Sequence, residues 1–260
     1  MIVVDKLCYR SKLRYVNAGE KFAFSILTLL FCVVSRSLVV AAVVFAANAC
    51  LTVGKGKIPG TLYARLLTVP FLFLILSTLA IIVNISKTPL DAYAIPVGHF
   101  FITGSFRSIL FGVQLIATAM ASVSCLYFLS LNTTMTDLLG VLLKLRCPTI
   151  LVELMLLIYR FIFVLLETAS AIMVSQKSRL GNKDYRTALD SFGRMGAGLL
   201  LRAFQRSNAL YDAMESRCYD GKIQVLEENY PVKRREIAAI VLFEAALLGI
   251  TIISSFYHIA

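Results

Sequence analysis

Two arginines are the residues of this sequence best suited to recognising a partner by charge, and each ends a long amphipathic stretch. The two ends comprise Ser178, Arg179, Leu180, Ser216, Arg217 and Cys218. An arginine in the last turn of a helix usually stabilises the helix dipole and the unpaired carbonyl groups there. Arg217, however, lies on the side of its helix that carries Leu199 and Leu210, away from the polar stripe. A guanidinium group on such a face is suited to an acidic pocket on a partner protein.

Other patterns for catalysis or metal binding are missing from the sequence. It contains no G-x-x-x-x-G-K-[ST] phosphate loop, no H-E-x-x-H and no C-x-x-C. The only histidines, His99 and His258, are far apart in the sequence. The cysteines are scattered and are expected to be free, buried thiols: Cys8, Cys32, Cys50, Cys125, Cys147 and Cys218. We therefore expect no catalytic residues, no metal ligands and no cofactor bound by this chain.

The composition indicates a protein that crosses a membrane several times. Hydrophobic residues make up 58% of the 260 residues and charged residues only 16%, with a mean hydropathy of +0.80. A water-soluble chain usually carries about 25% charged residues. The net charge of +11 does not require nucleic acid as a partner, because cytoplasmic loops of membrane proteins collect Lys and Arg and face anionic lipid.

The apolar runs predict five membrane-spanning helices, at about residues 22–34, 38–53, 66–84, 108–131 and 237–257. The first two form a hairpin that turns at Arg36, because a single helix over both would be far longer than a hydrocarbon core of about 30 Å. A basic, glycine-rich loop is expected at 54–60. Residues 85–107 contain Pro89 and Pro96 and are expected to form a loop with a short interfacial helix.

Residues 148–174 are apolar enough to resemble a further span, but their charges argue against it. Glu153, Arg160 and Glu167 are spaced by seven and therefore share one helix face. Each would cost about 2.5–3.5 kcal/mol at the centre of a bilayer on insertion scales. The helical pattern also continues to about Arg179. We therefore expect this helix to lie at or below the inner leaflet without crossing it.

The distribution of basic residues supports this topology. If the N-terminus is cytoplasmic and residues 148–174 do not cross, all but three of the 26 Lys and Arg residues lie on the cytoplasmic side. The three exceptions are Arg36, Lys87 and Arg107. If the segment crosses, the basic residues of 174–236 move outside, against the positive-inside rule. We expect a cytoplasmic N-terminus, an external C-terminus and no cleavable signal peptide.

The predicted fold is all-α, with five transmembrane helices and three cytoplasmic coupling helices. Residues 1–131 form a membrane domain, 132–236 a cytoplasmic coupling domain and 237–260 the final transmembrane helix. The coupling helices are expected at about 134–146, 148–179 and 187–217, and the last two are expected to cross beneath the membrane. Their facing charges could pair, for example Arg202 with Glu167. The predicted polar stripe of the two helices comprises Glu153, Arg160, Glu167, Arg194, Arg202, Asp212 and Glu215.

Over essentially its whole length the chain resembles the transmembrane (T) component of energy-coupling factor (ECF) transporters. That family has two arginine motifs, typically Ala-Arg-Gly, at the ends of two long coupling helices. The second motif usually reads Ala-Met-Glu-Ala-Arg-Gly-Tyr, and residues 213–219 here read Ala-Met-Glu-Ser-Arg-Cys-Tyr. The N-terminal residues 5–14, followed by Glu20 and Lys21, are similar to the cobalt-transport branch, CbiQ. The chain departs from the family at four positions next to the arginines: Ser178, Leu180, Ser216 and Cys218.

The resemblance implies a function as the coupling subunit of an ATP-driven importer in a prokaryotic cytoplasmic (inner) membrane. Arg179 and Arg217 would sit in grooves on two subunits of an ABC-type, CbiO-like ATPase dimer, which holds ATP and Mg²⁺. Closure of that dimer would act through the coupling helices on a substrate-binding, CbiM-like S component, accompanied by a small CbiN-like protein. The cargo would be Co²⁺, captured by the S component. Membrane lipid is the remaining expected partner.

The sequence has three alternative interpretations. The same coupling role could serve nickel or a vitamin as cargo, because the residues that select the cargo lie on another chain. A stand-alone secondary transporter would need ionisable residues and broken helices inside the membrane, whereas residues 66–84 and 108–131 carry no charge. An intramembrane enzyme would need a cluster of acid, base or metal-binding residues, and none is visible.

Overall fold

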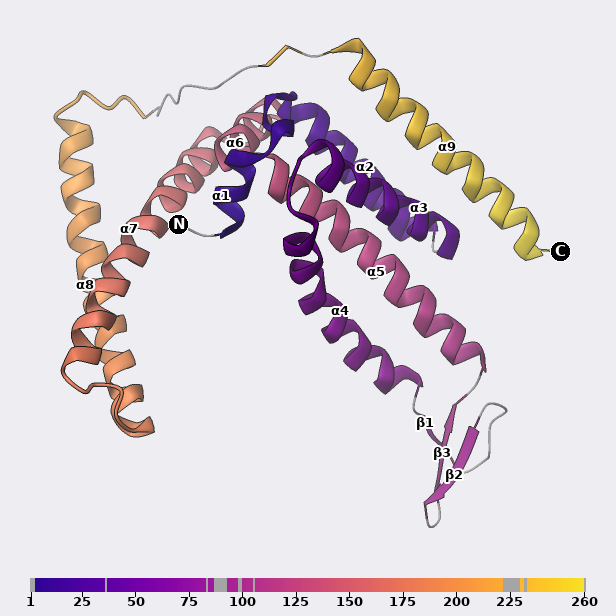
Figure 1. Ribbon diagram of the computed structural model, residues 1–260. Helices are drawn as coiled ribbons and strands as arrows, with labels where there is room; N and C mark the ends of the chain where they lie inside the picture. The colour runs from indigo at the N-terminus through magenta and orange to yellow at the C-terminus, as the bar shows by residue number, and fades with distance from the viewer. Residues whose placement is uncertain are drawn as a thin grey trace. The chain divides into compact units, whose positions relative to one another are not determined.

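The computed structural model describes the backbone of residues 3–35, 37–82, 84–86, 93–97, 100–104, 106–221, 230–231 and 233–259, with side chains over most of them. Helices dominate, which confirms the predicted all-α class (Figure 1). They are α1 (Val3–Arg10), α2 (Ala18–Ser35), α3 (Leu38–Ala49), α4 (Gly60–Ile82), α5 (Phe106–Asn132), α6 (Met135–Lys144), α7 (Thr149–Ser178), α8 (Tyr185–Glu215) and α9 (Arg234–Ile259). A 3₁₀ turn, Lys12–Tyr15, follows α1, and a π-helical segment, Cys50–Lys55, continues α3.

The chain divides into two compact units. We call Ile2–Thr134 with Asn229–Ala260 the bundle unit, and Met135–Glu228 the hairpin unit. Among the described residues, five helical segments are long and apolar enough to cross a membrane: α2, α3 with its π-helical continuation, α4, α5 and α7. Length and composition do not distinguish a span from a helix at the membrane surface, so the prediction that residues 148–174 remain on the cytoplasmic side stays a prediction.

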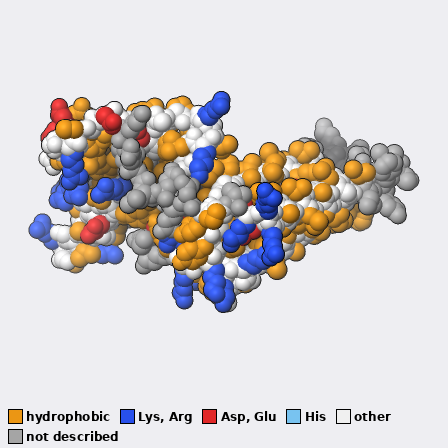
Figure 2. All heavy atoms as spheres, turned by 90° about the horizontal axis from the view of Figure 1, so that it is seen from above, with side chains coloured by type: hydrophobic (Ala, Val, Ile, Leu, Met, Phe, Trp, Pro, Cys, Tyr) orange, Lys and Arg blue, Asp and Glu red, His pale blue; other side chains and the backbone are white. Residues whose placement is uncertain are grey.

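In the bundle unit, α5 is the central helix. It packs against α2, α3 and α4, while α9 packs against α2 and α3 (Figure 1). α2 and α3 are separate helices in contact with each other, as the predicted hairpin at Arg36 requires. The interior of the bundle uses small side chains such as Cys32, Ala41 and Ala121, which let helix backbones approach closely. Figure 2 shows hydrophobic side chains over much of the visible face, as expected for a chain in contact with lipid.

The segment between α4 and α5 differs from the prediction. Its described residues form three short strands instead of an interfacial helix: β1 (Asn84–Ser86), β2 (Tyr93–Val97) and β3 (Phe100–Gly104). They form an antiparallel sheet in the order β1-β3-β2. Pro96 lies in β2, an edge strand, where the missing N–H of proline is tolerated. The aromatic and β-branched residues around Pro96 favour strands, and the prediction gave them too little weight.

A buried polar network ties the N-terminal segment to the end of α5. Lys21 is only 4% exposed, and its Nζ donates to the carbonyl oxygens of Leu13, at 3.1 Å, and Asn132, at 2.8 Å. The hydroxyl of Ser11 donates to Oδ1 of Asn132 at 2.7 Å. A Cβ on Gly56 would lie 2.7 Å from that same Oδ1 and 2.4 Å from the Thr52 carbonyl oxygen. The network therefore requires glycine at position 56 and fixes the C-terminal end of α5.

Two further observations bear on the sequence predictions. Glu244, within the predicted final span, accepts a hydrogen bond from the Thr28 hydroxyl at 3.1 Å, a polar contact that sequence analysis missed. All the cysteines are free, as predicted, but Cys50 and Cys218 are exposed, so the expectation of burial is wrong for these two. His99 and the side chain of His258 lie outside the described residues.

Candidate functional site

The hairpin unit consists mainly of α7 and α8, which run antiparallel and lie side by side (Figure 1). Pro148 immediately precedes α7, as predicted from its preference for helix starts. The two helices contact each other near the connecting turn, through Gln176 and Ser191, and at the far end, through Glu153 and Tyr219. Because α8 returns along α7, the C-terminal ends of the two helices lie at opposite ends of the pair.

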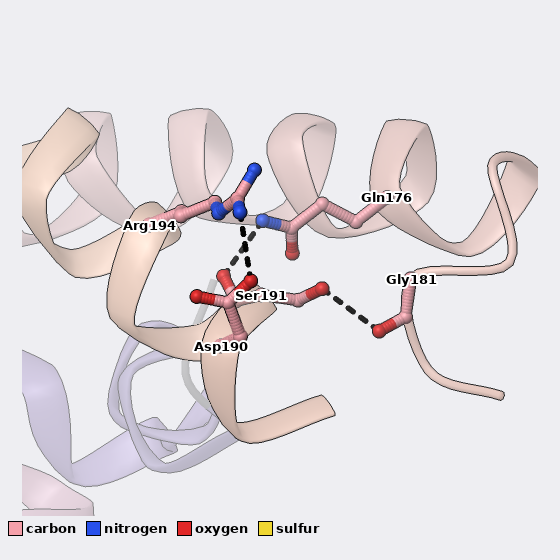
Figure 3. Close-up of polar contacts among 5 residues, drawn as sticks. All are labelled: Gln176, Gly181, Asp190, Ser191 and Arg194. Carbon is pink, nitrogen blue, oxygen red and sulfur yellow. Dashed lines mark hydrogen bonds and ion pairs between the residues drawn. The ribbon is translucent and has the colours of Figure 1, made fainter. Parts of the chain in front are cut away.

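The turn that joins the helices is held by side chains of both (Figure 3). The amide Nε2 of Gln176 donates to the Ser191 carbonyl oxygen at 2.7 Å, and the Ser191 hydroxyl donates to the Gly181 carbonyl oxygen at 2.8 Å. A Cβ on Gly181 would lie 2.9 Å from both the Gln176 carbonyl oxygen and the Ser191 hydroxyl. The backbone directly after Arg179 is therefore fixed against the first turns of α8.

The end of α7 is a Schellman motif with Arg179 as its C-cap residue. The N–H of Gly181 donates to the Gln176 carbonyl oxygen at 2.8 Å, and the N–H of Leu180 donates to that of Lys177 at 3.1 Å. Leu180 has a φ of 59°, in the left-handed region that this motif requires.

The end of α8 repeats this geometry. The N–H of Tyr219 donates to the Met214 carbonyl oxygen at 3.1 Å, and the N–H of Cys218 donates to that of Glu215 at 2.9 Å. Cys218 has a φ of 57°, so Arg217 directly precedes the left-handed residue, as Arg179 does in α7. The structure thus gives the two predicted ends the same backbone conformation, although the sequences of α7 and α8 differ.

Two of the residues that depart from the family pattern, Leu180 and Cys218, lie at the left-handed position of each motif. Glycine adopts a positive φ without penalty, whereas other residues lose roughly 1–2 kcal/mol there. In the resembled motif this place is glycine, and here it is Leu180 and Cys218, both exposed. The structure shows the consequence of these replacements as local strain at each helix end.

Arg179 and Arg217 both project into solvent. Their side chains are exposed, and neither guanidinium forms a hydrogen bond or ion pair with any residue that the structure describes. The carbonyl groups that a terminal arginine could satisfy are already bonded to backbone N–H groups of the Schellman motifs. Neither arginine is therefore needed to cap its own helix, and both guanidinium groups are available to a partner.

Tyr219 connects the end of α8 to the start of α7. Its hydroxyl donates to Oε2 of Glu153 at 2.7 Å, and Glu153 is only 8% exposed. The hydrogen bond to this carboxylate raises the pKa of Tyr219, and burial and the negative charge of Glu153 add to the shift. Sequence analysis placed Glu153 in a charged stripe and missed Tyr219, since the two residues are 66 positions apart.

The other members of the predicted stripe do not form one connected network. Arg194 pairs with Asp190 on its own helix at 2.9 Å (Figure 3). The suggested pair of Arg202 with Glu167 does not form among the described residues, and both side chains are exposed. Asp212 and Glu215 are also exposed, and Arg160 borders a cleft between α7 and α8. In the part of the chain that the structure describes, no three His, Cys, Asp or Glu residues are placed to hold a metal ion.

Comparison with known families gives a match over most of the chain. The family model described as CbiQ, cobalt transport protein, matches residues 10–227. This range includes both arginine ends and the whole of the α7–α8 pair.

Several individual proteins are also similar to the chain. An uncharacterized protein of Methanocaldococcus jannaschii is 35% identical over 248 residues, which cover 95% of this chain and 91% of that protein. A fused cobalt transport protein, CbiMQ, of Methanocorpusculum labreanum is 32% identical over 254 residues, covering 95% of this chain but only 41% of the fused protein. The cobalt transport protein CbiQ of Salmonella typhimurium is 25% identical over 224 residues, covering 85% of this chain and 98% of that protein.

Proposed function

The chain belongs to the CbiQ family of cobalt transport proteins, and from this premise we propose that it is the transmembrane coupling subunit of an ATP-driven energy-coupling factor importer. Its family and its five long apolar helices make it a multi-pass membrane protein with a role in cobalt transport. In the proposed role it links separate ATPase subunits to a substrate-binding S component and performs no catalysis itself. ATP and Mg²⁺ are held by the ATPase partners.

The observation that carries this proposal is the repeated geometry of the two arginine ends. Arg179 and Arg217 occupy the same place in two Schellman motifs, and both are exposed without a described partner. Since α8 has 31 residues, the two ends are about 45 Å apart along the pair. Two equivalent cationic ends on one chain fit two copies of one acidic groove, as a symmetric ATPase dimer of the CbiO type would offer.

An uncovered apolar stripe on α8 supports docking of a second kind of partner. Five large side chains recur at helical spacing and are each at least 60% exposed: Leu189, Phe192, Leu200, Phe204 and Tyr211. Between them, a Cβ on Gly193 or Gly196 would meet nothing within 4 Å, so a partner helix could approach closely. A continuous exposed apolar surface of this kind is typical of an interaction site. We assign it to a CbiM-like S component, with which a small CbiN-like protein would associate.

The fused relative supports this choice of S component. Its name joins CbiM and CbiQ in one chain, and the present chain corresponds to 41% of it. Two proteins that are fused into one chain in one organism commonly act together in organisms where they are separate chains. The cargo is then Co²⁺, captured by the S component. Comparing uptake of Co²⁺, Ni²⁺ and vitamins by the reconstituted complex distinguishes this cargo from the alternatives.

The pairing of α7 with α8 supports the proposed position of α7 at or below the inner leaflet. The helices are joined at both ends, by Gln176 with Ser191 and by Tyr219 with Glu153. If α7 crossed the bilayer, α8 would be drawn into the hydrocarbon with it. α8 carries four arginines, Arg186, Arg194, Arg202 and Arg206, each expensive at that depth. With both helices on the cytoplasmic side, movement of the ATPase subunits at either end is transmitted along a pair that is tied at both ends.

Charge reversal at both arginine ends tests the coupling role. We expect Arg179→Glu with Arg217→Glu to leave the chain in the membrane but to abolish copurification of the ATPase and ATP-driven uptake. Arg146→Glu with Arg186→Glu is the matched control, because it changes the net charge equally at exposed positions of the same unit. Arg146 also ends a helix, but it occupies the left-handed position itself, with a φ of 62°. Normal copurification and uptake in the first variant would reject the proposal.

A further inference from the structure

A cleft between α7 and α8 combines an apolar floor with two basic residues. It has a volume of about 300 Å³ and is bordered by Arg160 from α7 and Arg206 from α8. The walls between them are formed by half-buried hydrophobic side chains: Leu157, Phe161, Val164 and Leu210. A volume of this size is sufficient for a small ligand or a lipid headgroup.

The charge of the cleft is uncompensated. No acidic residue borders it, and neither Arg160 nor Arg206 forms a hydrogen bond or ion pair with any described residue. Arg194, by contrast, lies nearer the start of α8 and pairs with Asp190 at 2.9 Å. Two guanidinium groups that face one cleft without a carboxylate favour an anion that both can bind, and a phosphate group matches their forked geometry.

The apolar walls restrict which phosphate compound fits. A free phosphate ion would leave the hydrophobic walls exposed to water, whereas a phospholipid places its headgroup at the arginines and its acyl chains along apolar side chains. The outer surface of α7 next to the cleft continues this apolar character, since Leu154 is 47% exposed and Ile158 is 57% exposed. The occupant with both properties is an anionic phospholipid.

We propose that the cleft between α7 and α8 binds the phosphate headgroup of an anionic phospholipid, with Arg160 and Arg206 as its ligands. The site would hold the coupling pair against the inner leaflet at a point between the two arginine ends. The inference rests on the position proposed for α7 at the membrane surface. It concerns residues that the ATPase-docking proposal does not use, so the two can fail separately.

Lipid titration of the purified full-length chain tests the site. Native mass spectrometry in neutral detergent gives the apparent Kd of phosphatidylglycerol and of phosphatidylcholine with the same acyl chains. We expect the wild-type chain to prefer the anionic lipid. Arg160→Gln with Arg206→Gln should weaken phosphatidylglycerol binding about 30-fold, the combined effect expected of two basic residues at an anionic lipid surface. Binding of phosphatidylcholine should weaken less, because its choline cation already neutralises the phosphate charge. Arg186→Gln, which removes one exposed charge from α8 away from the cleft, should keep the preference.

Other outcomes would overturn the proposal. It fails if the wild-type chain does not distinguish the two lipids, or if the double variant keeps the preference. If the double variant is not recovered from membranes, each single variant should weaken phosphatidylglycerol binding about fivefold, and unchanged binding in both would count against the site. A photo-reactive amino acid in place of Ala213, which also borders the cleft, should form adducts of phospholipid mass in native membranes. Adducts with a protein alone would assign the cleft to a partner chain instead.

Discussion

Lys21 and Arg217 are both basic residues near helix ends, but their surroundings differ completely. Lys21, in the bundle unit, is 4% exposed and donates to two backbone carbonyl groups. Arg217, in the hairpin unit, is exposed and has no partner among the described residues. The glycines of the two units differ in the same way. A Cβ at Gly56, in the bundle unit, would clash with neighbouring atoms, whereas a Cβ at Gly193, in the hairpin unit, would have no atom within 4 Å. Lys21 and Gly56 stabilise the fold of the bundle unit, whereas Arg217 and Gly193 of the hairpin unit remain available to partners.

Adding a methyl group to one glycine of each unit should give the largest difference. In Gly56→Ala the new Cβ would lie 2.4 Å from the Thr52 carbonyl oxygen and 2.7 Å from Oδ1 of Asn132. We expect a loss of about 3 kcal/mol in the free energy of unfolding, because a close-packed backbone has to move. In Gly193→Ala we expect a gain of about 1 kcal/mol from the higher helix propensity of alanine. Thermal unfolding in detergent measures both, and equal effects would remove the contrast between the units.

Removing the hydroxyl of Tyr219 removes a hydrogen bond that joins α8 to α7 at the far end of the hairpin unit. In Tyr219→Phe the buried carboxylate of Glu153 loses the hydrogen bond from the phenol, so we expect a lower midpoint of thermal unfolding and faster proteolysis after α8. Tyr211→Phe is the control, because Tyr211 lies on the same helix and is 63% exposed. Equal protease resistance in the two variants would show that Tyr219 does not hold the pair together.

The same contact predicts an effect of alkaline pH. The pKa of Tyr219 is raised by its hydrogen bond to Glu153, so the neutral phenol is favoured in the folded chain. Its contribution to stability is fully present below the ordinary tyrosine pKa of about 10 and is lost as the pH rises through the raised value. Ultraviolet titration of wild type against Tyr219→Phe isolates this group. Glu153→Gln should bring its pKa back toward the ordinary value, and an unchanged titration would contradict the assigned cause.

Restoring glycine at the left-handed positions should have the smallest effect. Leu180→Gly and Cys218→Gly each remove a side chain from a residue with a φ near 60°. We expect each to raise the free energy of unfolding of the hairpin unit by about 1 kcal/mol, without loss of ATPase copurification. A fall in stability for both variants would mean that the positive φ is not a source of strain. Thermal unfolding monitored by circular dichroism measures this change in stability for both glycine variants.

The features that depend on a local sequence pattern could be predicted from the sequence. Long apolar runs predicted the helical class and the separate helices on either side of Arg36. The end of α7 was expected at about Arg179, and the structure ends the helix at Ser178 with Arg179 as its cap. Such features are encoded by residues that are neighbours along one helix.

The features that the sequence did not reveal depend on contacts between distant positions. The carbonyl oxygen of Asn132 lies 111 positions from Lys21, and Glu153 lies 66 positions from Tyr219, so no local pattern marks either contact. The sheet between α4 and α5 was missed for another reason. Proline usually marks a loop, but an edge strand tolerates it, and Pro96 lies in such a strand. The roles of Arg179 and Arg217 as docking residues remain predictions, because they concern a partner.

The most direct test of the coupling account asks on which side of the membrane the α7–α8 turn lies. In a chain whose accessible cysteines, Cys50, Cys147 and Cys218, are replaced by serine, Asn182→Cys places a single reporter in that turn. We predict that a membrane-impermeant maleimide labels it only after cells are permeabilised, while Lys87→Cys, in the segment expected outside, is labelled in intact cells. Labelling of position 182 in intact cells would place the Arg179 end away from any cytoplasmic ATPase and would contradict the account.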